Sequence, residues 1–465
     1  MELKLKEIAE AVKGRYCGDA SDGDRMITGV VTDSRQVEPG NLFIAIRGER
    51  SDGHRYIPDV FEKGAAAVFA EEELADPKGP YILVKSSEQA LKDLAEYYRS
   101  RLTIPIVGIT GSVGKTSTKE MIASVLAQKY HVLKTEGNFN NEIGMPLTLL
   151  RIRPEHEAAV VEMGIDHFGE MHRLAKVARP DICVMTNIGP CHLENLGDLD
   201  GVLKAKSEIF DFLKPDGAIV LNGNDPKLSL IGEPSGVKPM RYFVEAEEDS
   251  GPDHEYFVRA RSVKNNGLHG MEADLAFSDG RCIHVTEPLP GTHHIYNACA
   301  AACVAARLGL TEQEIIAGIA SAQTIAGRSN RIDLADDICL IDDCYNANPV
   351  SMRTSMDVLA LSKGRTIAVL GDMGELGADE VNLHREVGAY VKEKQIDLLY
   401  CTGDLSKHLA EAAGGGHTQV FWFDSREELL NALKPAIRSE DTILVKASHF
   451  MNFTDVVNQL KEYSH

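Results

Sequence analysis

No apolar run in this sequence of 465 residues approaches the ~20 consecutive residues that a helix needs to cross a bilayer. Residues 1–16 predict an amphipathic helix with charges throughout, and they contain no apolar core of the signal-peptide type. We therefore expect a cytoplasmic protein with no membrane span.

Paired cysteines are also missing, although the chain has nine Cys. They are scattered singly and none forms a C-x-x-C pair, which argues against a disulfide framework and indicates a reducing compartment. Cys299 and Cys303 are four residues apart in an Ala-rich run, a pattern that favours small residues packed between helices over a reactive pair.

Basic residues are few relative to acidic ones. The chain has 49 Lys and Arg against 70 Asp and Glu, which gives a formal net charge of -21. Such a surface repels a phosphate backbone, so we expect no nucleic-acid partner. A single nucleotide is not excluded, because backbone N–H groups together with Mg²⁺ can hold its phosphates locally.

The chain is too long for one hydrophobic core, and apolar strands alternate with helices in three blocks. We predict an α/β protein of three domains: a small N-terminal domain (1–100), a central domain built on a doubly wound sheet (101–325) and a C-terminal Rossmann-like domain (326–465). Hairpins are predicted at residues 265–267 and 278–280. Strands are predicted at residues 42–46, 65–69, 104–110, 158–162, 182–186, 218–221, 338–341, 366–370, 398–401 and 442–445.

A Gly-containing turn follows the first strand of the central block. Its glycines let the backbone turn tightly around a phosphate, Lys115 can neutralise phosphate charge, and the Thr116 hydroxyl can coordinate Mg²⁺. Position 109 is Ile, so the loop is one Gly short of the full G-x-x-x-x-G-K-[ST] pattern. The strand before it and the helix after it still favour nucleotide binding over a plain turn with an exposed Lys. The residues concerned are Gly111, Ser112, Val113, Gly114, Lys115, Thr116 and Ser117.

Polar residues follow the next strands at the edge where ligands bind in doubly wound sheets. Glu162 ends one strand and could complete an Mg²⁺ site opposite Thr116, or it could be a solvated Glu. His192 follows the next strand. Lys206 lies 14 residues further on, in a helix, where by itself it is a surface Lys.

Two further polar clusters are ambiguous. Asn141 belongs to an amide-rich stretch, residues 138–144, that could be no more than Asx-turns and a helix cap. Asp342 and Asp343 end a strand of the third block, where they could hold a metal or a ribose hydroxyl, or cap the helix that follows.

Taken together, these residues resemble the Mur ligase family of peptidoglycan synthesis over essentially the whole chain. The ordered motifs that carry the resemblance are residues 110–117, 138–146, 162–164, 187–192, 205–206, 291–297 and 342–352. Residues 343–352 and 371–377 look like the branch that joins D-alanyl-D-alanine to UDP-N-acetylmuramoyl-tripeptide. Residues 32–40 resemble the uridine-nucleotide-binding stretch of that branch. A sister ligase shares that stretch, but its D-N-P-R signature is absent here.

The resemblance implies a role for each candidate residue. Lys115 and Thr116 would hold ATP and a first Mg²⁺ with Glu162, and His192 would serve a second Mg²⁺ with Lys206 as its carbamate. It also implies that Thr32, Ser34 and Arg35 bind the uridine nucleotide. Asn141 would bind ATP, Asn297 its adenine and Asp343 its ribose. The γ-phosphate would be bound by Arg328 or Arg331, and the spacing does not decide between them.

The implied reaction has two steps. The tripeptide carboxylate attacks the γ-phosphate of ATP to give an acyl phosphate, and the amine of D-alanyl-D-alanine then displaces phosphate. No residue stands out as the base for that amine, and the third residue of the tripeptide stays open. We expect a monomer. The alternatives are a related amide ligase, such as a folylpolyglutamate synthetase, and a regulatory nucleotide-binding module without ligase activity.

Two stretches depart from the family pattern. Residues 291–294 read Gly-Thr-His-His where the family often has Asn after the first His, and residues 446–449 read Lys-Ala-Ser-His in place of K-G-S-R. The Arg that ends the family pattern is therefore missing at this edge.

Overall fold

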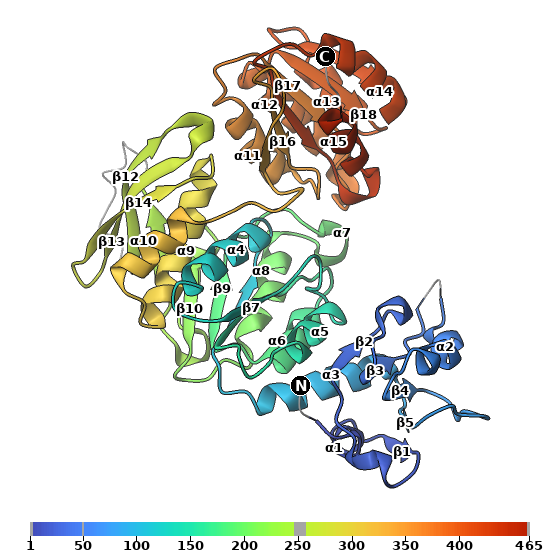
Figure 1. Ribbon diagram of the computed structural model, residues 1–465. Helices are drawn as coiled ribbons and strands as arrows, with labels where there is room; N and C mark the ends of the chain where they lie inside the picture. Colours follow the sequence, from blue (N-terminus) through green and yellow to red (C-terminus); the bar gives the residue numbers. More distant parts are fainter. Residues whose placement is uncertain (1–2, 49–50, 246–256, 463–465) are drawn as a thin grey trace.

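The computed structural model describes residues 3–48, 51–245 and 257–462, and they form three α/β units, each with its own sheet. Figure 1 shows the central unit lying between the N-terminal unit and the C-terminal unit. The predicted fold class, α/β with three domains, is confirmed. No helix in these described ranges is long and apolar enough to cross a membrane.

The N-terminal sheet has the strand order β1-β5-β4-β3-β2, with β1 antiparallel to β5 and the other pairs parallel. Its strands are β1 (Arg15–Cys17), β2 (Gly29–Val31), β3 (Asn41–Ile44), β4 (Ala67–Ala70) and β5 (Tyr81–Leu83), and its helices are α1 (Leu5–Ala11), α2 (Ile57–Glu62) and α3 (Ser87–Ser100).

The helix predicted over residues 1–16 is shorter in the structure. Residues 1–2 lie outside the described residues, and α1 ends at Ala11. Lys13 then adopts a left-handed conformation (φ 52°), and Arg15–Cys17 pairs with β5 as strand β1. Strand pairing therefore overrides the amphipathic pattern at this point.

The central sheet has nine strands in the order β14-β13-β12-β11-β10-β9-β6-β8-β7. All pairs are parallel from β7 to β12, whereas β13 and β14 extend the sheet as the two predicted hairpins. The strands are β6 (Ile106–Thr110), β7 (Val132–Lys134), β8 (Ala158–Glu162), β9 (Ile182–Met185), β10 (Ala218–Asn222), β11 (Met240–Val244), β12 (Val258–Asn265), β13 (Met271–Phe277) and β14 (Cys282–Glu287).

Helices cover both faces of the central sheet. Successive residues of its buried strands point to opposite sides, so both faces carry apolar side chains that need to be covered. Ile106 packs into one core and Val107 into the other. The core on the side of Ile106 also contains residues of the N-terminal unit, because α3 lies against α5 and α6. The helices are α4 (Lys115–Leu126), α5 (Gly144–Leu150), α6 (Glu170–Ala178), α7 (Leu193–Leu196), α8 (Leu199–Ser207), α9 (Thr292–Arg307) and α10 (Glu312–Ala320).

The C-terminal sheet has the order β15-β16-β20-β17-β18-β19, in which only the β15–β16 pair of the described strands is antiparallel. Its strands are β15 (Asn330–Asp333), β16 (Cys339–Asp342), β17 (Thr366–Leu370), β18 (Leu398–Thr402), β19 (Gln419–Phe423) and β20 (Thr442–Lys446). Its helices are α11 (Pro349–Leu359), α12 (Glu380–Glu393), α13 (Ser406–Ala413), α14 (Arg426–Leu433) and α15 (Thr454–Lys461).

The topology fixes where a ligand can bind. From β6 the chain runs first to β7 and β8 on one side and then to β9 on the other, so the strand order reverses at β6. Open α/β sheets bind ligands at the carboxyl ends of the strands beside such a reversal. The carboxyl ends of β6, β8 and β9 carry the Gly-containing turn, Glu162 and the segment that leads to His192.

Candidate active site

The turn between β6 and α4 is held in shape by the end of β9. The side-chain amide of Asn187 accepts a hydrogen bond from the Val113 N–H and donates one to the Val113 carbonyl, each at 2.9 Å. The Thr186 hydroxyl donates to the same carbonyl at 2.7 Å. Gly114 (φ 81°) immediately precedes α4, so the N–H groups of the first helical turn are free to meet a phosphate.

Gly111 is required by both its conformation and its surroundings. Its φ is 150°, and a Cβ added there would lie 2.0 Å from Thr186 Oγ1. We predict that Gly111→Ala costs about 1–3 kcal/mol of stability and weakens nucleotide binding about tenfold, since it displaces Thr186 from the turn. Thermal unfolding and titration with a fluorescent ATP analogue measure the two effects.

Gly137→Ala is the matched control for this substitution. Gly137 also has a positive φ (51°), but nothing lies within 4 Å of an added Cβ. It should lose stability without losing nucleotide affinity. Equal nucleotide affinity in both variants would show that the fit of Gly111 against Thr186 is unimportant.

Glu162 lies at the centre of a buried polar network. The Thr116 hydroxyl donates to Glu162 Oε2 at 3.0 Å, and the Asn140 amide donates to Oε1 at 2.9 Å. The Glu162 side chain is buried, and Lys119 Nζ, itself buried, lies 3.9 Å from Oε2. A buried carboxylate needs such a cation and such donors. The result is an oriented oxygen ligand beside the phosphate turn.

Two adjoining cavities open beside this network, with volumes of about 110 Å³ and about 530 Å³. Both are lined by the central unit and by the C-terminal unit, and the larger one also by Glu88 of α3 in the N-terminal unit. The residues that line both cavities are Lys115, Glu162, His192, Arg328, Asn346 and Glu375. A ligand that fills them would therefore touch both units.

His192 forms an ion pair across the gap between the two units. Its Nδ1 lies 2.6 Å from Oε2 of Glu375, and the imidazole next to this carboxylate lowers the pKa of Glu375. Both residues have positive φ, 50° for His192 and 60° for Glu375. Glu375 belongs to the 371–377 motif, and the sequence gives no sign that it meets His192.

Lys206 is buried at the end of α8, with 1% of its surface exposed. No hydrogen bond or ion pair joins its ammonium to another part of the described chain. Burial, with a smaller contribution from Lys115, lowers the pKa of Lys206 to about 8. A neutral amine at neutral pH is therefore accessible here, which is the form that reacts with CO₂.

The C-terminal unit presents Arg328 to the cavities. Its guanidinium lies 3.9 Å from the centre of the Tyr345 ring, which fixes the side chain by a cation–π contact. Arg331 is engaged elsewhere, because it pairs with Asp333 at 2.9 Å and donates to the Leu268 carbonyl. Of the two arginines between which the sequence did not decide, Arg328 is the one that lines the cavities.

The Asp343 carboxylate is hydrogen-bonded to other residues of the C-terminal unit. It accepts hydrogen bonds from Lys446 Nζ (2.6 Å), the Ser355 hydroxyl (2.5 Å) and the Ser329 N–H (2.9 Å). Within residues 446–449, Lys446 agrees with the family pattern and His449 departs from it, and the two have different partners. Lys446 secures Asp343, and His449, which stands where the family has Arg, packs edge-on against Tyr345 and lines the larger cavity.

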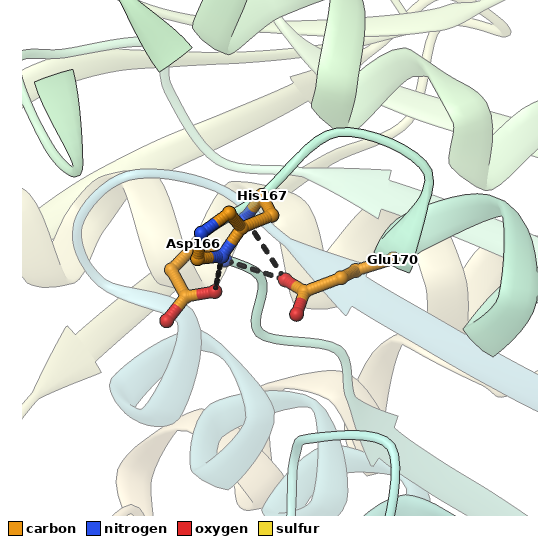
Figure 2. A group of neighbouring side chains, drawn as sticks. All are labelled: Asp166, His167 and Glu170. Atoms are coloured by element: carbon orange, nitrogen blue, oxygen red, sulfur yellow. Dashed lines mark hydrogen bonds and ion pairs between the residues drawn. The ribbon is translucent and has the colours of Figure 1, made fainter. Parts of the chain in front are cut away.

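Asp166, His167 and Glu170 form a small acidic cluster between β8 and α6, which the sequence did not single out (Figure 2). His167 Nδ1 lies 2.6 Å from Asp166, and this contact raises the pKa of His167. Glu170 accepts hydrogen bonds from the N–H groups of both neighbours. Asp166 and Glu170 line the larger cavity and add to its negative charge.

The other predicted residues are spread more widely. Asn141 lines the larger cavity, where its side-chain oxygen accepts from the Gly144 N–H. The Asn297 side-chain oxygen accepts from Thr118 on α4. Next to it, His294 is buried with both ring nitrogens unpartnered within the described chain, and it faces a cavity of about 10 Å³ together with Ser117.

Thr32, Ser34 and Arg35 lie in the N-terminal unit after β2, where Asp33 and Arg35 form an exposed ion pair at 2.7 Å. They line neither of the two adjoining cavities, so these three residues stand apart from the phosphate turn.

Comparison with known proteins matches all three units to one family. Residues 26–99 match the model of the Mur ligase family catalytic domain, residues 109–305 the Mur ligase middle domain, and residues 327–449 the Mur ligase glutamate ligase domain. The chain is 37% identical to the UDP-N-acetylmuramoyl-tripeptide–D-alanyl-D-alanine ligase of Escherichia coli, covering 99% of each chain. It is 35% identical to the ligase of the same name from Bacillus subtilis, covering 98% of each.

Solved structures agree with these matches. The crystal structure of MurF from Acinetobacter baumannii superposes with a TM-score of 0.89 at 30% identity, over 100% of this chain and 99% of the other. MurF ligase from Thermotoga maritima in complex with ADP gives a TM-score of 0.81 at 29% identity, over 93% and 97% of the two chains.

Proposed function

The chain belongs to the Mur ligase family, and from this membership we propose that it couples ATP cleavage to the joining of D-alanyl-D-alanine to UDP-N-acetylmuramoyl-tripeptide. One observation carries the proposal. The phosphate turn and Glu162 of the central unit face Arg328 of the C-terminal unit across a shared pair of cavities. This arrangement suits phosphoryl transfer, which depends on positioning and on neutralising charge.

ATP binds with its phosphates at the turn between β6 and α4. The N–H groups of Gly114, Lys115 and Thr116 are placed to meet the phosphates, since those of Ser112 and Val113 already donate to Asn187. Lys115, whose Nζ lies 2.9 Å from the Gly111 carbonyl, is placed to neutralise them. We also assign Ser117, Asn141 and Asn297 to ATP. Asp343, whose carboxylate is held by Lys446, would bind the ribose.

The oxygen ligands of Thr116 and Glu162 fit Mg²⁺, since the buried carboxylate is already oriented by Asn140 and the Thr116 hydroxyl. A second ion fits at His192 with Lys206 as its carbamate, because the amine is buried and unpartnered and its pKa is low. Bound Mg²⁺ neutralises phosphate charge in the transition state. The chain's own part is to hold these ligands in place and to exclude water from the acyl phosphate.

The two peptide substrates approach from different sides. We place the uridine nucleotide at Thr32, Ser34 and Arg35, so its tripeptide extends towards the larger cavity, where its carboxylate meets ATP. The acidic lining formed by Asp166 and Glu170 suits the amino group of the dipeptide. We also propose domain limits at residues 1–100, 101–325 and 326–465, a cytoplasmic location and a monomer.

Arg328 is the arginine that we assign to the γ-phosphate. Arg328→Ala is expected to lower kcat/KM for ATP about 10-fold to 100-fold, the loss of one charged hydrogen-bond donor to phosphate. Arg331→Ala should stay within about threefold of wild type, because its partners are Asp333 and a backbone carbonyl. Steady-state kinetics with varied ATP measure both. A larger loss for Arg331→Ala would reverse the assignment.

The proposed function is tested by acceptor choice. Phosphate release is measured with ATP, Mg²⁺ and UDP-N-acetylmuramoyl-tripeptide, with D-alanyl-D-alanine, D-alanine or an L-amino acid as acceptor. Release and a UDP-muramoyl-pentapeptide product, identified by mass, are expected with D-alanyl-D-alanine. No product with the dipeptide, or the same rate with every acceptor, would overturn the proposal.

A further inference from the structure

The ion pair between His192 and Glu375 is one of several contacts between the central unit and the C-terminal unit, which also meet where Arg331 donates to the Leu268 carbonyl. His192 immediately precedes α7 of the central unit, and Glu375 lies in the loop after β17 of the C-terminal unit. Gly377 in the same loop lies against the backbone of Glu194. In Figure 1, α7 stands at the edge of the central unit that faces the C-terminal unit.

The loop that carries Glu375 is fixed within the C-terminal unit. The Gly374 N–H donates to the Ser448 hydroxyl at 2.9 Å, and the Met373 N–H donates to His384 Nε2 at 2.9 Å. His384 is fully buried in α12. The backbone next to Glu375 therefore moves with its unit, and so the position of Glu375 relative to His192 depends on how the two units are placed.

The contact has a consequence for the other ring nitrogen of His192. Oε2 of Glu375 lies 2.6 Å from Nδ1 of His192, although not in the direction of a hydrogen bond from that nitrogen. The carboxylate therefore occupies the Nδ1 side of the ring and leaves Nε2 as the nitrogen for a metal. Metal-binding histidines commonly have a carboxylate beside the ring nitrogen that does not bind the metal, and this neighbour sets the orientation of the ring. His192 lines the same cavity as Thr116 and Glu162, where oxygen ligands are already oriented.

Stability alone does not account for this pair. The side chains of His192 and Glu375 are 27% and 64% exposed, and ion pairs at such positions contribute little. Both backbones also adopt a left-handed conformation that ordinary residues avoid. A strained, exposed pair between two units is better explained by its effect on the orientation of the His192 imidazole.

We propose that Glu375 is a positioning residue that orients His192 for metal binding only when the C-terminal unit is docked on the central unit. The proposal rests on the function proposed above, because it takes His192 as a metal ligand. Docking of the units and metal affinity are then linked, and each strengthens the other. Asp166 is the competing orienting group, because its carboxylate interacts electrostatically with the same imidazole.

The test measures metal binding directly. Mn²⁺ binding to the full chain with a non-hydrolysable ATP analogue is followed by electron paramagnetic resonance, for wild type, Glu375→Ala, Glu375→Gln, His192→Ala and the double alanine variant. Glu393→Ala is the matched control, since Glu393 is an exposed carboxylate at the end of α12 in the same unit. Thermal unfolding of every variant checks that it folds.

We expect Glu375→Ala to weaken the second Mn²⁺ site about tenfold. The glutamine variant keeps an oxygen of the same side-chain shape beside Nδ1 and should stay within about threefold of wild type. The double variant should bind no worse than His192→Ala alone, because a residue that acts through His192 has nothing left to orient. Three results would overturn the proposal. The losses of Mn²⁺ affinity in the two single alanine variants could multiply in the double variant, or Glu375→Ala could bind Mn²⁺ as the wild type does. The third is a greater loss of affinity in Asp166→Asn, measured alongside, than in Glu375→Ala.

Small-angle scattering adds a second readout. Mn²⁺ with the ATP analogue should make the wild type more compact, and Glu375→Ala should need about ten times more Mn²⁺ for the same change. Failure of the proposed function would appear differently. The wild type would then form no product with D-alanyl-D-alanine, whether or not it binds Mn²⁺. The two hypotheses can therefore fail separately.

Discussion

Lys206→Ala is expected to lower turnover about 1,000-fold while leaving the fold intact. Loss of a ligand to one of two metal ions removes several kcal/mol of transition-state stabilisation, and about 4 kcal/mol corresponds to that factor. Stability should not fall, because the buried ammonium has no partner in the described chain and its removal relieves a desolvation cost. Product formation and thermal unfolding measure the two effects.

The same hypothesis gives the wild type a dependence on CO₂ and pH. Only the neutral amine reacts with CO₂, and a pKa of about 8 leaves about one Lys206 in ten neutral at pH 7. The reactive fraction rises as pH rises through 8 and falls below it. At a fixed low CO₂ concentration, activity should therefore increase from pH 6.5 to pH 8, and added CO₂ should reduce that dependence.

Lys204→Ala is the control for this series. Lys204 lies on the same helix but is exposed, with its ammonium over the Phe168 ring. Its removal should change turnover less than about threefold. Full activity of Lys206→Ala, or a wild type that works equally well after thorough removal of CO₂, would contradict the carbamate.

Much of the fold could be predicted because its strands are short, apolar and buried on both faces. Such strands appear in the sequence as uninterrupted runs of Val, Ile, Leu and Ala. The prediction placed β8 at its exact limits and β6 within two residues of its start. Three-residue strands such as β1, β2 and β7 were not predicted, because too few residues carry the pattern. For β1 the partner strand β5 also lies far away in the sequence.

A site residue could be predicted from the sequence when its residue type and its position at the end of a strand are enough to identify it. The phosphate turn, Glu162 and His192 each follow a buried strand, and the structure brings all three to adjoining cavities. Lys206 gave no local signal, since burial of a helical Lys depends on the packing of α8 rather than on its neighbours in sequence. Glu375 was equally hidden, and the choice between Arg328 and Arg331 could not be made from the sequence, because both depend on contacts between units.

Lys115→Ala is expected to lower turnover about 100-fold to 1,000-fold, with a smaller rise in KM for ATP. A cation placed at the migrating phosphoryl group stabilises charge that spreads over its oxygens in the transition state, and removing one such group costs about 3–4 kcal/mol. Lys115→Arg should recover little, since a planar guanidinium does not replace a compact ammonium over a tight turn.

The structure makes this loss separable from misfolding. The only hydrogen bond of Lys115 Nζ with another described residue is the one to the Gly111 carbonyl, so the substitution should cost no more than about 1 kcal/mol of stability. Lys129→Ala is the matched control, because Lys129 follows the same helix and its Nζ also donates to one backbone carbonyl, that of Gly309. It should lose similar stability and no turnover. Comparable turnover in both alanine variants would show that Lys115 does not act on the transferred phosphate.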